Sequence, residues 1–95
     1  MSAVALKKIS EPITSLDGTE HLDSLTANGT YHQAMVKNAS ARMGYPENSV
    51  AGLLEVHSPD ANMVYQRFTE FWSGRVWHRG SYRGEWKPWV EVATT

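Results

Sequence analysis

The chain has 95 residues, of which 41% are hydrophobic and 20% charged, and this composition fits one globular domain with a single core. It contains no cysteine, which excludes disulfides, thiolate metal sites and thiol nucleophiles. The formal net charge of -1 provides no overall field to attract nucleic acid. No apolar run reaches the roughly 18 residues that a membrane span needs, so we expect no membrane insertion.

Residues 1–19 are interpreted as a lead-in arm or linker. They include Pro12 and Gly18 and show neither a helical stripe nor a long alternation of apolar and polar residues. The beginning of the chain also lacks the apolar region and cleavage pattern of a signal peptide. We therefore place the folded domain at residues 20–95 and expect that no signal peptide directs its secretion.

The body of the chain predicts a small antiparallel β domain. Leu22 and Leu25 are three residues apart, which suffices for one short helical turn. Beyond Asn28-Gly29, segments of β-forming residues alternate with turn residues. Pro88 interrupts the last segment and places it at an edge. We predict a mainly β, single-domain fold of about five short strands, at residues 30–36, 50–57, 63–72, 75–79 and 85–92.

Residues 37–50 form the longest predicted connection. Asn38, Ser40, Gly44, Pro46 and Asn48 make it dense in turn formers. Long loops of this kind tend to carry variable or functional surface. We therefore expect candidate receptor contacts here.

Catalysis and metal binding are not indicated by any motif. The four histidines show no HxH or HExxH spacing, and the chain has neither a GxSxG elbow nor a glycine-rich phosphate loop. We expect no enzymatic activity, no cofactor and no metal. The histidines are His21, His32, His57 and His78.

All four tryptophans lie in the last quarter of the chain, and four of the five arginines alternate with them. Neighbouring glutamates cancel much of the positive charge, so we expect no nucleic-acid binding. Two interpretations remain: exposed indoles that stack on a sugar ring, or an internal brace. In the brace, Arg79 would lie between Trp77 and either Trp86 or Trp89. Trp72, at a predicted hairpin tip, is the indole that we expect to face solvent.

Several short motifs follow one another in a definite order between residues 20 and 92. The first is Leu-x-x-Leu-x-x-x-Gly-x-Tyr, which ends at Tyr31. A short apolar strand, an alternating strand with Gln66, an aromatic-x-Arg strand at 77–79 and a closing Gly-x-Trp-x-x-Trp at 84–89 follow. This order resembles the pyocin-knob type of domain of bacteriophage tail fibres and tail-fibre-like bacteriocins.

The resemblance implies a non-enzymatic structural or host-adhesion module of a phage tail, made in the host cytoplasm and located in the virion. Other tail proteins or fibre subunits are the implied partners, with a homotrimer as one possible arrangement and host surface polysaccharide as a possible receptor. It assigns structural roles to Tyr31, Trp77, Arg79, Trp86 and Trp89.

Candidate receptor contacts are expected at the hairpin tip and in the long loop. They are Trp72, Tyr45, Arg42 and Asn48. The alternative function is a free-standing carbohydrate-binding module that uses exposed tryptophans.

Overall fold

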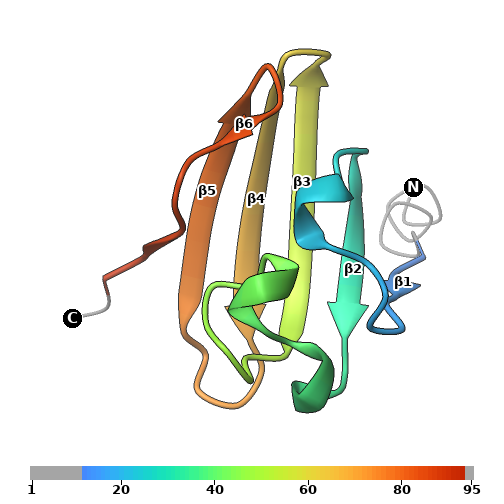
Figure 1. Ribbon diagram of the computed structural model, residues 1–95, viewed down its shortest axis with the longest axis vertical. Helices are drawn as coiled ribbons and strands as arrows, with labels where there is room; N and C mark the ends of the chain where they lie inside the picture. The colour runs from blue at the N-terminus through green and yellow to red at the C-terminus, as the bar shows by residue number, and fades with distance from the viewer. Residues whose placement is uncertain (1–11, 94–95) are drawn as a thin grey trace, which may run out of the picture.

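The computed structural model describes residues 12–93, and these residues form one seven-stranded sheet with three short 3₁₀ turns (Figure 1). No α-helix occurs within this range. The turns are η1 (Leu22–Ser24), η2 (Val36–Asn38) and η3 (Ala41–Met43). The strands are β1 (Thr14–Ser15), β2 (Gly29–Gln33), β3 (Gly52–Asp60), β4 (Met63–Glu70), β5 (Val76–Tyr82), β6 (Glu85–Trp86) and β7 (Val90–Glu91).

The strands follow chain order across the sheet, from β1 at one edge to β6 at the other, and β7 also pairs with β5. Only the β1–β2 pair is parallel among the described strands. At the far edge, β6 and β7 pair with opposite ends of β5. Residues 87–89 leave the ladder between them, where Pro88 lacks the N–H that a strand requires.

The predicted small, mainly β fold is confirmed, with differences in detail. β2 to β5 lie at four of the expected strands, and η1 is the expected helical turn. The expected fifth strand is divided into β6 and β7, and the parallel strand β1 was not predicted. Two residues of strand provide too little alternation to be recognised in a sequence.

Part of the predicted lead-in arm packs on the domain. β1 pairs with β2, and the Leu16 backbone N–H donates a 2.8 Å hydrogen bond to the His32 carbonyl. The Leu16 side chain is 9% exposed and belongs to the core. Residues 12–19 therefore contribute to the fold, whereas residues 1–11 lie outside the described range.

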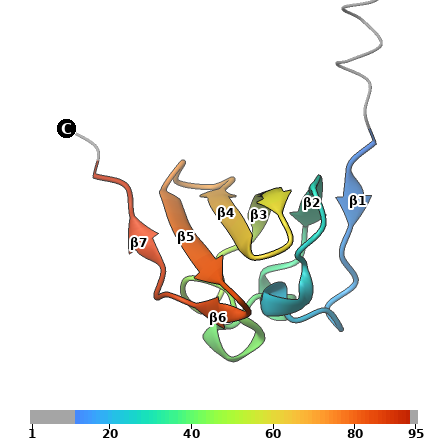
Figure 2. The same ribbon diagram turned by 90° about the horizontal axis from the view of Figure 1, so that it is seen from above.

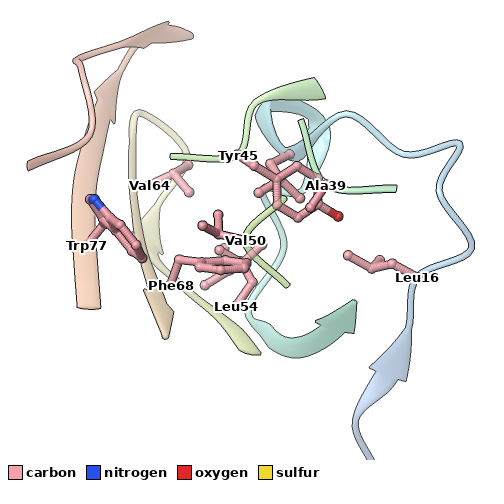
Figure 3. Close-up of a cluster of buried hydrophobic side chains, with 10 residues drawn as sticks. Leu16, Ala39, Tyr45, Val50, Leu54, Val64, Phe68 and Trp77 are labelled. Atoms are coloured by element: carbon pink, nitrogen blue, oxygen red, sulfur yellow. The ribbon is translucent and has the colours of Figure 1, made fainter. Parts of the chain in front are cut away.

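The core lies on one face of the sheet. Leu54, Phe68 and Trp77 are register partners on β3, β4 and β5, and all three are buried. Figure 2 shows the connections that carry the 3₁₀ turns on one side of the sheet only. Side chains from these connections, including Ala39 and Tyr45, complete the core (Figure 3). The edge of Tyr45 meets the Phe68 ring with centroids 5.6 Å apart.

We predict that Gly52→Ala destabilises the fold. Gly52 is buried in β3, and a Cβ there would overlap the backbone carbonyl of Thr69 on β4. Because backbone cannot move aside as a flexible side chain can, we expect a loss of about 1–3 kcal/mol in the free energy of unfolding. Urea denaturation measures this loss.

Gly80→Ala is the matched control for that substitution. Gly80 also lies within a strand, but its nearest atom to a new Cβ is the Val64 carbonyl oxygen at 3.8 Å, an ordinary contact. We expect a change within about 0.5 kcal/mol. Equal midpoint shifts for the two variants would contradict the prediction.

Candidate functional site

A buried arginine lies between two indoles at the β5 edge of the sheet. The Arg79 guanidinium carbon is 4.2 Å from the centroid of the Trp86 ring and 4.4 Å from that of Trp89. Arg79 is 8% exposed, so these cation–π contacts are largely removed from water, where they are strongest. Arg79 is stacked on indoles as predicted, but its partners are Trp86 and Trp89, and Trp77, which we expected on one side of it, is not among them.

Two polar side chains contact the same guanidinium at its edge. Arg79 Nε donates a 2.8 Å hydrogen bond to Gln66 Oε1, and Arg79 Nη2 lies 2.9 Å from Asp23 Oδ1. The Asp23 contact is an ion pair by proximity, without the alignment of a hydrogen bond. Burial lowers the pKa of Arg79, and the Asp23 carboxylate opposes this shift. An arginine remains charged in such a setting, because its ordinary pKa lies far above neutral pH.

Gln66 connects the arginine to the first 3₁₀ turn. Its Nε2 donates hydrogen bonds to the Leu22 carbonyl at 2.7 Å and the Leu25 carbonyl at 3.0 Å. Gln66 is 1% exposed, and an amide buried so deeply requires such partners. The sequence placed Gln66 on an alternating strand but gave no indication of these contacts, since its acceptors are more than 40 residues away.

The two indoles also bond to the connections that cover the core. Trp86 Nε1 donates to the Asp23 carbonyl at 3.2 Å, and Trp89 Nε1 donates to the Gly44 carbonyl at 2.8 Å. Both side chains are only partly buried and pack against the core. We call Arg79, Gln66, Trp86 and Trp89 the arginine clasp. It joins the C-terminal segment to the sheet and to both covering connections.

The remaining residues of the structural motif lie in or beside the core. Trp77 is 4% exposed, and its ring lies 4.6 Å below the Arg75 guanidinium carbon rather than against Arg79. Tyr31 packs against the core, and its hydroxyl donates to the Ala27 carbonyl at 3.2 Å. Neither ring is presented as a free surface for stacking.

Arg75 ties the β4–β5 turn to two other segments. It forms ion pairs with Glu47 at 2.9 Å and with Glu91 at 2.8 Å. Hydrogen bonds from Arg75 lower the pKa of Glu91. These groups are exposed, so each pair contributes little stability. Their effect is to position the turn against the long loop, which the sequence did not reveal.

The predicted receptor contacts fall in different environments. Trp72 is 83% exposed at the turn after β4, as expected for a contact residue. Arg42 and Asn48 are also exposed, although Asn48 Oδ1 accepts a 2.8 Å hydrogen bond from the Ala41 backbone N–H. No hydrogen bond or ion pair found between residues 12 and 93 joins Trp72 directly to Arg42 or Asn48.

Tyr45 requires a correction, because it is a core residue. It is 3% exposed, and its hydroxyl accepts a 3.3 Å hydrogen bond from Gln33 Nε2. Burial raises the pKa of the Tyr45 hydroxyl. The long loop folds over the sheet and inserts Tyr45 against Phe68. Its turn-rich composition had suggested a surface position for the whole segment.

Two shallow hollows lie on the described surface. One, of about 280 Å³, is lined by His32, Ala34 and Phe71. Phe71 is 61% exposed and meets Trp72 edge-on, with ring centroids 5.8 Å apart. The other hollow, of about 220 Å³, lies around Asn28 and His57, beside β2 and β3. Only the first adjoins the exposed indole.

Neither a metal-binding cluster nor a membrane-spanning helix is found in the described part of the chain. Residues 12–93 contain no group of three or more histidine, aspartate or glutamate side chains placed to hold a metal ion. No described helix is long and apolar enough to cross a membrane.

Solved structures of similar fold come from tail fibres and a tailspike. No protein-family model matches the sequence, and a comparison with curated proteins gives no significant match. The chain is 26% identical to the Pseudomonas aeruginosa R1 pyocin fibre, with a TM-score of 0.75 over 85% of this chain and 21% of that chain. The chain is also 26% identical to an N-truncated R2-type pyocin tail fibre, with a TM-score of 0.77 over 90% of this chain and 34% of that chain.

A tailspike of Acinetobacter phage vb_AbaP_AS12, gp42, shares 20% identity and the fold, with a TM-score of 0.74 over 90% of this chain and 16% of that chain. The predicted resemblance to domains of pyocin tail fibres is thereby confirmed, and the tailspike shares the fold. The chain spans between about a sixth and a third of the chains that it matches.

We predict that Arg79→Ala lowers the free energy of unfolding by about 1–3 kcal/mol, because the stacking and the hydrogen bond to Gln66 are both lost. Arg79→Lys keeps the charge but not the planar group, so it should recover only part of the loss. The exposed Arg42→Ala is the control, with a change within about 0.5 kcal/mol. Thermal and urea denaturation measure the free energy of unfolding of all three variants. An unchanged denaturation midpoint for Arg79→Ala would refute the stabilising role of the arginine clasp.

Proposed function

We propose that this chain is a non-enzymatic structural or host-attachment module of a phage-type tail fibre. The observation that carries the proposal is the match in fold, at 26% identity, to R1 and R2 pyocin fibres. The chain covers only part of each of those fibres, so its role is that of one domain. The proposed location is the virion tail, with other tail proteins or fibre subunits as partners and a homotrimer as one possible assembly.

The use of the aromatic residues supports a structural module. Trp86 and Trp89 stack on Arg79, and their N–H groups are bonded to backbone carbonyls. Trp77 is buried. Three of the four indoles are therefore engaged in holding the domain together, which favours the brace over a broad aromatic binding surface.

Trp72 is the residue that we propose for receptor contact. Its turn is fixed by a 2.9 Å hydrogen bond from the Gly74 N–H to the Glu70 carbonyl and by the Arg75–Glu47 ion pair. An exposed indole on a fixed turn offers an apolar face at little entropic cost. The apolar face of a sugar ring in a host surface polysaccharide suits such a group.

Adsorption of particles tests the attachment role. In the tail particle that carries this chain, we expect Trp72→Ala to weaken the apparent affinity of adsorption to host cells by about tenfold, which corresponds to a loss of about 1.4 kcal/mol of contact energy. Ile13→Ala removes another exposed apolar side chain, directly before β1, and should leave adsorption unchanged.

Deletion of residues 12–93 from the fibre extends this test to the module as a whole. We expect the deletion to impair either particle assembly or adsorption. Normal particles with normal adsorption after that deletion would refute the proposed function.

A free-standing carbohydrate-binding module is the second candidate, favoured by the 83% exposure of Trp72 and the adjoining hollow at Phe71. Titration with host surface polysaccharide should shift tryptophan emission in the wild type. The shift should disappear in Trp72→Phe and persist in Met35→Leu, a control at another exposed apolar position. Absence of any shift across a panel of glycans would exclude stacking on this indole.

A further inference from the structure

The face of the sheet opposite the core has no second layer among residues 12–93 (Figure 2). Alternate residues of a strand point to opposite faces, so the neighbours of the buried core residues lie on this side. We call it the open face. Six of its residues are apolar or aromatic: Leu53, Met63, Tyr65, Val76, Tyr82 and Val90.

Polar residues such as Thr30, Arg67 and His78 lie among them, but the exposed aromatic and apolar side chains distinguish this face from a fully polar one. The uncovered side of an antiparallel sheet usually alternates to polar residues. Here Tyr65, Tyr82 and Val90 are 46%, 51% and 54% exposed. Both lysines of the described range, Lys37 and Lys87, lie in connections and outside the strands. Protein interfaces are likewise rich in tyrosine and poor in lysine.

Charged groups of both signs lie side by side at the centre of the open face. Glu55, Arg67 and His78 are register partners across β3, β4 and β5. No ion pair within residues 12–93 joins Glu55 to Arg67. Arg67 is exposed and Glu55 is half-buried, so both charges reach the surface. A surface that carries adjacent charges of opposite sign can be complementary to another copy of itself.

The size of the open face indicates how strong such an association would be. The strands β2 to β5, spaced about 4.8 Å apart with about 3.3 Å per residue, make a face of roughly 20 by 23 Å. With about 450 Å² on each copy, the contact would be smaller than a standard specific interface and in the range of weak, transient ones. The isolated chain should therefore associate weakly and in a concentration-dependent manner.

We propose that the open face is the surface through which one copy of this chain binds a second copy. This inference names the partner surface of the fibre module and in that sense rests on the proposed function. Its evidence is nevertheless separate, namely the apolar residues of the open face and the adjacent charges of Glu55 and Arg67.

Charge reversal on the open face provides the test. Glu55→Arg makes the centre of the face positive, and Arg67→Glu makes it negative. In sedimentation velocity over a range of concentrations, we expect the wild type to self-associate and each variant alone to associate at least about tenfold more weakly, because like charges then meet. An equimolar mixture of the two variants should associate again. Lys87→Glu, a reversal outside the face, should behave as the wild type.

Several outcomes would overturn the proposal: a wild type that stays monomeric at every concentration, association that neither reversal alters, or a mixture that fails to associate although both variants are folded by circular dichroism. If either variant fails to fold, Tyr82→Asp places a charge at an exposed position of the same face and must weaken association. If the chain does not self-associate but the deletion of residues 12–93 still impairs particles or adsorption, only the self-association proposal fails. If the chain self-associates but that deletion changes neither particles nor adsorption, only the proposed fibre function fails.

Discussion

The buried guanidinium of Arg79 is the constraint on which the rest of the structure depends. A charge that is 8% exposed is tolerated only if polar and aromatic partners replace the water it has lost. Here these partners come from three separate parts of the chain: Gln66 on β4, Asp23 in η1, and the indoles of Trp86 and Trp89 in the C-terminal segment. Satisfying one side chain therefore fixes the first turn and the last segment against the sheet, in a chain that has no cysteine with which to join them.

This arrangement determines which surfaces remain for function. The indoles of the closing motif are occupied in the arginine clasp, which leaves Trp72 as the one tryptophan with most of its surface in solvent. Because the covering connections all lie on one side of the sheet, its other side keeps aromatic and charged residues without a second layer among the described residues. In this single-layer sheet, the covered face and the arginine clasp stabilise the domain. The open face and the turn that carries Trp72 remain accessible to partners.

Much of this could be predicted from local patterns, and the failures have identifiable causes. The alternation around Phe68 correctly predicted the strand β4, and the position of Trp72 at the predicted hairpin tip correctly predicted its exposure. Tyr45 was assigned to the surface because turn formers surround it, yet the loop folds back and buries its ring against Phe68. The ion pair between Arg75 and Glu47 joins residues 28 positions apart, and no spacing in the sequence indicates it.

The sequence by itself determined the fold class, the strands β2 to β5, and the stacking of an arginine on tryptophans, because alternation, turn residues and composition act over a few neighbouring positions. Only the tertiary structure decided which indoles enclose Arg79, where the Gln66 amide finds its acceptors, and which face of the sheet stays uncovered. These depend on contacts between residues from 7 to more than 40 positions apart, whose geometry is set by how the strands pair and how the loops close over them.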